Sequence, residues 1–465
     1  MGTSKRIVQL MAVAAMVHPV RSVSSVGHGS HHVLSVARVT RALQLGIISP
    51  TLRHGERMDV AGFRESFPPL LEDDPPVYLD NACMTLRPQS VIQAVQTYYA
   101  RNPSCAGRSV HRWGMSISQT VSRTRRKLAN HIGANNASEV IFTPNATHSI
   151  NQVSAGMKWK QGDVVISSDR EHNSNLVPWL QQSTAGVKLK TVKSRPDNTF
   201  DLERFEAACA EAGNSLRMVS LVHVGNLDGV EIPIAKASKI AHDHGAIVHV
   251  DGAQSAPHMP INVEELGCDL FSFSLHKMLG PTGVGALWGR EEILSELEPI
   301  CAGGGTVESA SAEHYSLRPI PDRLEGGLGH YAGICGTEAA LDFLARYDMR
   351  EMAEQEVRVN RIMSDGIKHL PGVEIIGPEN AAMRGGICSI LLENLDVQNV
   401  GILMDEVGSV FVRSGLHCVN QWFDAHGIEQ GSLRASAYAY NTEEEARCFV
   451  DTFNEIIEGL TEESA

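Results

Sequence analysis

From Asp59 onward, short apolar runs rich in β-branched residues alternate with longer stretches of helical periodicity. The runs predicted to be strands are 140–143, 164–168, 187–192, 218–223, 247–251, 270–273 and 284–288. Strands that alternate with helices are typical of βαβ units around a mostly parallel sheet. The expected fold class is therefore α/β.

Near Gly336 this pattern changes to a long amphipathic helix that is predicted to continue to about Leu370. Strands are predicted after it at 373–376, 388–392 and 410–413. The change predicts a large domain over residues 58–335 and a smaller α+β C-terminal domain over residues 336–465.

The composition of the chain argues against several classes of function and of site. The chain has 465 residues, which is long enough for more than one packed region, and 43% of them are apolar. The formal net charge of −14 argues against nucleic acid as a partner, because binding to phosphates needs a basic surface. Nine cysteines without a C-x-x-C pair fit neither a disulfide scaffold nor a zinc ribbon, so we expect a reducing compartment and no metal site.

Residues 1–57 form a basic leader that differs from the rest of the chain. It holds seven Lys or Arg and one acid, Glu56, so the leader carries +6 and the remainder −20. Its apolar run at 7–17 is too short to span a membrane, which takes about 20 residues, and we expect no membrane association. Three interpretations stay open: an organelle transit peptide, an extension ahead of Met58, or a secretory signal. A transit peptide would place the protein in a plastid or mitochondrion, and otherwise we expect it in the cytoplasm.

Residues with potential chemistry follow two of the predicted strands. Asp251 closes the run 247–251 and Gln254 lies in the turn after it, at the strand end where parallel sheets bind ligands. Alone, such an aspartate is more often a cap of the next helix. Lys277 follows the strand 270–273 and precedes a glycine-rich stretch at 279–285. A partly desolvated lysine in this position can form a Schiff base.

These segments resemble a known family. The turn Asp251-Gly-Ala-Gln and the run Ser274-x-His-Lys-x-x-Gly-Pro-x-Gly-x-Gly look like the class V group of pyridoxal phosphate (PLP) enzymes, and specifically the SufS-like cysteine desulfurases. Further matching pieces are Tyr78-Leu-Asp-Asn-Ala, Val110-His-Arg, Glu171-His-Asn-Ser-Asn-Leu-Val-Pro-Trp, Arg413-Ser-Gly-Leu-His-Cys and Leu433-Arg-Ala-Ser. The resemblance covers residues 78–460 and implies a fold-type I PLP-dependent transferase.

The resemblance also implies roles for individual residues. Asp251 would keep the pyridine nitrogen of PLP protonated, and Gln254 would bond the ring oxygen. Lys277 would attach the cofactor covalently and later move the substrate α-proton, while His172 would stack on the ring and assist proton transfer. Thr147 starts a predicted helix, whose N-terminus favours phosphate. The other residues implied to contact the cofactor are Ser274, His276 and Asn226.

Cys418 distinguishes a desulfurase from other enzymes of this group. It lies in a polar, glycine-containing loop, a setting that favours the thiolate. In the resembled family this thiol attacks the sulfur of PLP-bound cysteine, which leaves an enzyme persulfide and releases alanine. Arg434 is implied to clamp the substrate carboxylate, with Asn226 nearby. The interval of sixteen positions between Cys418 and Arg434 resembles the SufS-like branch, whose cysteine lies on a short loop.

The implied function is conversion of L-cysteine to L-alanine for sulfur transfer such as iron-sulfur cluster assembly, by a homodimer that passes sulfur to an acceptor protein. Selenocysteine lyases, cysteine C–S lyases and class V aminotransferases or epimerases share the fold and the lysine, and an idle, non-catalytic binding protein is a further alternative. The chain departs from the family pattern at Cys83, Asn173, Leu328 and Val419. Of these, Leu328 replaces a threonine that reaches the partner subunit's phosphate in the family.

Overall fold

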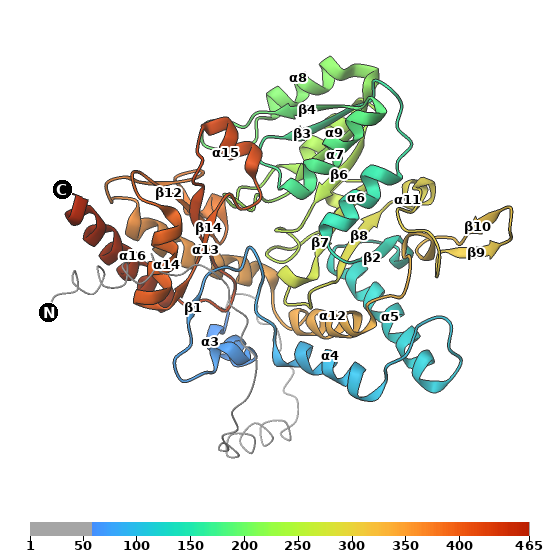
Figure 1. Ribbon diagram of the computed structural model, residues 1–465, viewed down its shortest axis with the longest axis horizontal. Helices are drawn as coiled ribbons and strands as arrows, with labels where there is room; N and C mark the ends of the chain where they lie inside the picture. Colours follow the sequence, from blue (N-terminus) through green and yellow to red (C-terminus); the bar gives the residue numbers. More distant parts are fainter. Residues whose placement is uncertain (1–57, 465) are drawn as a thin grey trace. The chain divides into compact units, whose positions relative to one another are not determined.

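A seven-stranded sheet, seen in Figure 1, is the largest sheet of the described residues. It places Asp251 and Lys277 at the ends of two neighbouring strands. The computed structural model describes residues 58–464, so the basic leader, residues 1–57, lies outside the described residues. The strand order is β2-β8-β7-β6-β5-β3-β4. The strands of this sheet are β2 (Val140–Thr143), β3 (Val164–Ser168), β4 (Lys188–Val192), β5 (Leu216–Val222), β6 (Ile247–Asp251), β7 (Leu270–Ser274) and β8 (Gly285–Gly289).

Strand β8 is antiparallel to its neighbours β2 and β7, and the other pairs in the sheet are parallel. The mostly parallel sheet that the sequence predicts is thus confirmed, and its strands have the predicted bounds to within two residues. Strands β3, β7 and β8 are buried along their whole length, as expected when helices cover both faces of a sheet.

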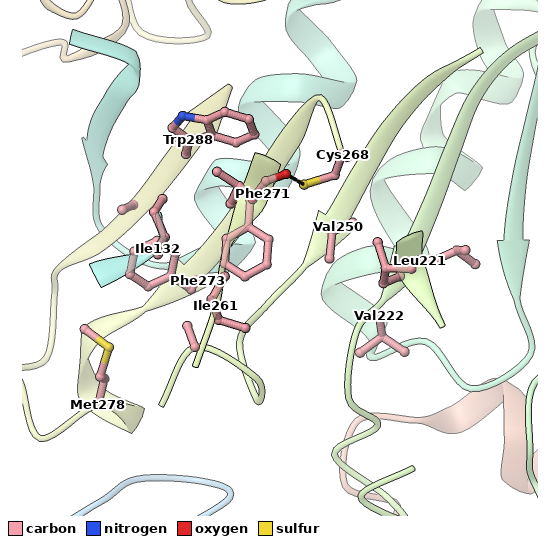
Figure 2. Close-up of a cluster of buried hydrophobic side chains, with 14 of the residues drawn as sticks. Ile132, Leu221, Val222, Val250, Ile261, Cys268, Phe271, Phe273, Met278 and Trp288 are labelled. Atoms are coloured by element: carbon pink, nitrogen blue, oxygen red, sulfur yellow. Dashed lines mark hydrogen bonds between the residues drawn. The ribbon is translucent and has the colours of Figure 1, made fainter. Parts of the chain in front are cut away.

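The core beneath the strand ends is shown in Figure 2. The rings of Phe271 and Phe273 on β7 lie 5.8 Å apart, and Val250 on β6 is in register with Phe271. This packing also explains a glycine of the predicted cofactor turn. A Cβ at Gly252 would lie 2.0 Å from Cζ of Phe271, so a larger residue after Asp251 would clash with the core.

Helices separate most of the strands, and α12 packs against α4 and α5 (Figure 1). The helices of the described residues are α3 (Val60–Arg64), α4 (Gln89–Arg101), α5 (Arg112–His131), α6 (Ala146–Gly156), α7 (Val177–Gln181), α8 (Leu202–Ala212), α9 (Ile234–Asp243), α10 (Val263–Leu266), α11 (Glu291–Glu296), α12 (Tyr331–Leu344), α13 (Met349–Ile367), α14 (Val397–Gly408), α15 (Asn420–His426) and α16 (Glu443–Ser464). No helix within residues 58–464 is long and apolar enough to cross a bilayer.

A second, four-stranded sheet follows in the C-terminal part of the chain, with the order β11-β12-β15-β14 and antiparallel pairing throughout. Its strands are β11 (Val373–Ile375), β12 (Ile387–Leu392), β14 (Arg413–Gly415) and β15 (Ser432–Ser436). Two further pairs are the parallel strands β1 (Val77–Tyr78) and β13 (Val410–Phe411) and the antiparallel strands β9 (Val307–Ala310) and β10 (Tyr315–Leu317).

Two predicted elements were wrong. The single long helix from Gly336 to Leu370 is instead the pair α12 and α13, because the side chain of Asp348 caps a new helix by accepting from the amide of Arg350 at 2.8 Å. The predicted strand 410–413 divides in two. Its first two residues form β13, which pairs with β1, and its last residue, Arg413, begins β14, which pairs with β15, so one extended run serves two sheets.

Candidate active site

Lys277 and Asp251 lie at the ends of the neighbouring parallel strands β7 and β6. Burial raises the pKa of Asp251, while the Ala253 amide, 2.9 Å from Oδ1, and the charge of Lys277 lower it. Burial lowers the pKa of Lys277, Asp251 partly offsets this, and Arg434 adds to the lowering. The net result is a lysine pKa below its usual value, which favours the free amine and so nucleophilic attack.

Local hydrogen bonds fix the turn that carries Lys277. The carbonyl oxygen of His276 accepts from the amide of Thr85 at 3.1 Å, and the Leu275 amide donates to Val284 O at 3.0 Å. The glycine-rich stretch then brings β8 against helix α6. A Cβ at Gly285 would lie 2.5 Å from Cα of Asn145, so this approach requires glycine. Burial, followed by the charges of Lys277 and Arg87, lowers the pKa of His276 to about 4, so its imidazole is neutral at pH 7.

Hydroxyl groups gather at the N-terminus of α6. Ser274 Oγ accepts from the Ala146 amide at 2.8 Å, and Asn145 caps the helix through the His148 amide at 2.9 Å. Thr147, in the first turn, shares a 2.6 Å hydrogen bond with Ser174 Oγ. A helix N-terminus flanked by hydroxyls is suited to bind a phosphate group.

His172 is partly buried, and burial is the main cause that lowers its pKa to about 3. The charges of Lys277 and Arg434 also lower this pKa, so both residues lie near the imidazole. Its Nδ1 accepts from the amide of Ser174 at 3.0 Å, so the neutral ring carries its proton on Nε2. The preceding Glu171 is fully buried and accepts from Ser168 Oγ at 2.5 Å and Asn175 Nδ2 at 2.7 Å. Burial raises the pKa of Glu171 to about 7 despite these donors.

Gln254 and Asn226 each leave one buried oxygen without a hydrogen-bond partner among the described residues. Gln254 Nε2 donates to Ala82 O at 2.7 Å, and its second amide hydrogen remains available. Asn226 Nδ2 donates to the carbonyl oxygen of His417 at 2.8 Å. Because buried polar atoms are nearly always paired, unpaired atoms at this position indicate a place for a ligand.

The loop that carries Cys418 is tied to three other elements. Asn226 Nδ2 holds His417 O, the Asn173 amide donates to Cys418 O at 2.6 Å, and His417 Nε2 lies 2.9 Å from Ser432 Oγ on β15. His417 and Cys418 both adopt positive φ, at 49° and 58°. Cys418 itself is exposed. Burial is the main cause that lowers the pKa of Lys277, and the charge of Cys418 is one of the smaller effects that raise it. The sulfur of Cys418 therefore lies within electrostatic range of the lysine amine.

Arg434 lies on β15 and is 2% exposed. Its Nη1 donates to Asn226 O at 2.8 Å and its Nη2 lies 3.4 Å from Asp80 Oδ1, whereas its buried Nε has no partner within residues 58–464. Asp80 also pairs with Arg413 at 3.2 Å. The arrangement presents a desolvated guanidinium with spare donor capacity, which suits a carboxylate.

The structure places the ten predicted site residues at strand ends, in loops, in the first turn of α6 and on β15, and their chemistry fits PLP. The observations that test the fit are the lowered pKa of Lys277, the buried carboxylate of Asp251 beside it, and the unpaired amide oxygens of Gln254 and Asn226. The hydroxyls at the start of α6 suit the cofactor phosphate. No cluster of three or more His, Cys, Asp or Glu that could hold a metal ion occurs in the part of the chain that the structure describes.

Comparison with known proteins identifies the family of this chain. Residues 77–449 match the sequence model of the family described as Aminotransferase class-V. The chain belongs to this family. It is 35% identical to a probable cysteine desulfurase of Halalkalibacterium halodurans, over 83% of this chain and 95% of that protein. It is 34% identical to a cysteine desulfurase of Haloferax volcanii, over 82% of this chain and 90% of that protein.

The structure of this class V protein also matches a solved relative. The apo cysteine desulfurase from Thermococcus onnurineus aligns with a TM-score of 0.82 and 32% identity, over 87% of this chain and 99% of that one. The fold expected from the sequence, a mostly parallel α/β sheet of the fold-type I PLP-dependent transferases, is confirmed.

Sequence analysis missed the roles of Asp80, Glu171 and Arg413, although each lies inside a quoted motif. A motif shows which residues recur together but not that Asp80 joins two arginines.

The sequence analysis also named Cys83 without giving it a role. Burial lowers the pKa of Arg413, but the charge of Asp80 and then that of Cys83 outweigh this effect and raise it. A second thiol therefore lies next to the arginine pair.

Proposed function

We propose that this protein is a PLP-dependent cysteine desulfurase, which converts L-cysteine to L-alanine and retains the sulfur as a persulfide on Cys418. The observation that carries this proposal is the loop of Cys418, which presents an exposed thiol and is tied through Asn226 to Arg434. The curated relatives of Halalkalibacterium halodurans and Haloferax volcanii, which carry the name cysteine desulfurase, support it.

The residues divide the work as follows. PLP, when bound, supplies an electron sink for the substrate α-carbon. Lys277 would attach the cofactor covalently, and Asp251 would keep its pyridine nitrogen protonated. As a free amine, Lys277 would also take and return the α-proton of the substrate. Thr147, Ser274 and His276 would bind its phosphate, Gln254 its ring oxygen, and His172 its ring face. Arg434 and Asn226 would bind the substrate carboxylate.

Cys418 would do the step that defines the reaction. Its thiolate sulfur attacks the sulfur of the bound cysteine, the new S–S bond replaces the substrate C–S bond, and the electron pair of that bond passes to the substrate carbon, which a proton completes to a methyl group. One cysteine and one enzyme thiol thus give one alanine and one enzyme persulfide. The tied loop favours this step because it limits the positions of the thiol relative to Arg434.

A Cys418→Ser variant tests the proposal. We expect it to bind PLP and L-cysteine but to form no alanine and no persulfide, because a neutral hydroxyl is a poor nucleophile towards sulfur. Cys301→Ser is the matched control, since Cys301 is another exposed free cysteine and we expect full activity from it. The measurements are alanine by amino-acid analysis and persulfide by mass spectrometry. Alanine formation by Cys418→Ser at the rate of the unaltered protein would refute the mechanism, and release of pyruvate and ammonia would favour a C–S lyase.

We also propose that the protein works as a homodimer and passes its sulfur to an acceptor protein, for uses such as iron-sulfur cluster assembly. Large apolar side chains that are exposed on the single chain support an interface between subunits: Tyr99, Val110, Trp113, Met115 and Leu328. Sedimentation at micromolar concentration tests the dimer.

The division into domains at residues 58–335 and 336–465 remains a prediction. Residues 1–57 decide the compartment, which is cytoplasmic unless they act as a transit peptide.

A further inference from the structure

A fully buried ion pair joins two loops of the candidate active site. Arg170 lies in the loop after β3, two positions before His172, and Asp228 lies in the turn after β5. Both side chains are 0% exposed, and Arg170 Nη1 donates to Asp228 Oδ2 at 2.8 Å. The other buried nitrogens of the guanidinium, Nε and Nη2, have no hydrogen-bond partner among the described residues. The position of the Arg170 side chain therefore depends on one carboxylate.

The turn formed by residues 225–230 carries Asp228 and is closed by short hydrogen bonds. The Gly225 amide donates to Val230 O at 3.1 Å. Asp228 Oδ1 accepts from the Val230 amide at 3.0 Å, so one carboxylate oxygen shapes the turn while the other binds Arg170. A Cβ at Gly225 would lie 2.4 Å from Asp228 Oδ1, because the turn fits closely around the carboxylate. The turn is thus a compact unit that Arg170 anchors to the loop after β3.

The same turn reaches the proposed substrate arginine and the loop of the proposed nucleophile. Asn226 O accepts from Arg434 Nη1, and Asn226 Nδ2 donates to His417 O, both at 2.8 Å. Leu227 belongs to one buried apolar cluster with Val419, which follows the proposed nucleophile in the chain. One side of the turn is therefore anchored by the ion pair, and the other side holds two groups that the proposed reaction needs.

We propose that Arg170 and Asp228 are positioning residues of the desulfurase reaction, because their ion pair fixes this turn. The effect reaches the reaction through Asn226, whose side chain holds the loop of Cys418 and whose carbonyl oxygen holds Arg434. Loss of either partner would leave a buried charge uncompensated, so the pair stays closed in the folded protein. This inference rests on the proposed function.

The test is steady-state alanine formation by the PLP-bound protein, with rates expressed per bound PLP so that a loss of folded protein does not count. Asp228→Asn keeps the shape of the side chain and an oxygen for the Val230 amide, but it removes the charge that faces Arg170. We expect kcat to fall about fivefold and KM for L-cysteine to rise about twofold or more, because Asn226 no longer has a fixed position.

A double variant shows whether the effect passes through Asn226. In Asn226→Ala the bond to His417 O is already absent, so the addition of Asp228→Asn should lower kcat by less than about twofold more. A merely structural role would multiply the two losses to roughly 25-fold. The alkylation rate of Cys418 by iodoacetamide, read by peptide mass spectrometry, is a second measurement that needs no desulfurase activity. It should rise by the same factor in both single variants and in the double variant, since each frees the same loop.

Two further variants complete the design. Asp269→Asn is the matched control, because Asp269 is also a buried aspartate that pairs with an arginine, Arg290, at 3.1 Å. It precedes β7, whereas Lys277 follows that strand, so this control should lower the melting temperature without changing kcat or KM. Arg170→Lys keeps the cation but loses the planar fork, and it should give a smaller loss of kcat that is likewise absent in Asn226→Ala.

The possible outcomes separate this inference from the proposed function. An unchanged kcat in Asp228→Asn, losses that multiply in the double variant, or an equal loss in Asp269→Asn would each overturn the positioning role. Failure of the unaltered protein to form alanine would refute the proposed function instead. The alkylation rates would then decide whether the ion pair positions the loop of Cys418, and an unchanged rate in Asp228→Asn would show that it does not.

Discussion

Replacement of Arg434 tests how the substrate carboxylate is held. The guanidinium is 2% exposed and has spare donor capacity at Nε, so a carboxylate bound there would be largely desolvated. Truncation of one partner in such a pair costs about 2–4 kcal/mol. For Arg434→Ala this corresponds to a loss of roughly 30- to 900-fold in kcat/KM for L-cysteine. Arg434→Lys keeps the charge but loses the planar fork, and we expect about half of that free-energy loss.

The fold should tolerate these substitutions. Asp80 lies 3.4 Å from Arg434 but only 3.2 Å from Arg413, so it keeps a cationic partner in both variants. The assay is steady-state alanine formation over a range of cysteine concentrations, with urea denaturation of each variant. Arg447→Ala, which removes an exposed arginine of α16, is the control and should retain full activity. Small and equal effects of alanine and lysine at position 434 would show that Arg434 lies outside the substrate site.

Three other substitutions probe the site. Lys277→Ala should abolish covalent attachment of PLP, and borohydride reduction followed by peptide mapping should find the cofactor on this lysine in the unaltered protein. For Glu171, whose buried pKa is about 7 against an ordinary 4.5, the folded state holds the proton more tightly, so stability should fall by about 3 kcal/mol as pH rises from 4.5 to 7. Urea denaturation across this range should show that Glu171→Gln removes that component. Asn226→Ala removes the bond to His417 O, which is worth about 1 kcal/mol, so kcat for alanine should fall about fivefold in steady-state assays, and KM for L-cysteine should rise because Asn226 is also proposed to bind the substrate carboxylate.

The sequence predicted the central sheet and the lysine turn because both depend on local signals. Strands β3 and β6 were placed to the residue, since each is a short apolar run followed by a turn. The glycines after Asp251 and Lys277 point to close packing for a similar reason. A Cβ at Gly252 would meet Phe271 in the core, and one at Gly285 would meet the backbone of Asn145.

The errors occurred where pairing partners decide the structure. Nothing within residues 410–413 shows that β13 pairs with β1 while β14 pairs with β15, because both halves have extended backbones. The prediction of one helix from 336 to 370 was wrong because of one side chain, that of Asp348. An aspartate inside an amphipathic pattern can either face solvent within a helix or cap the start of a new one. In both cases the structure depends on contacts between residues that the hydrophobic periodicity of the sequence does not reveal.

The loop of Cys418 shows why a role for the thiol can be proposed from the sequence, whereas the conformation of the loop cannot be predicted from it. Positive φ angles at His417 and Cys418 cost about 1–2 kcal/mol each for residues with a Cβ, so local preference opposes this conformation. What offsets the cost comes from distant segments: the amide of Asn173, the side chain of Asn226 and Ser432 on β15. The strained loop therefore persists only in the folded protein, where its three ties limit the movement of the thiol. Loss of any one tie should affect sulfur removal more than PLP binding, because Lys277 and Asp251 lie on strand ends that these bonds do not hold.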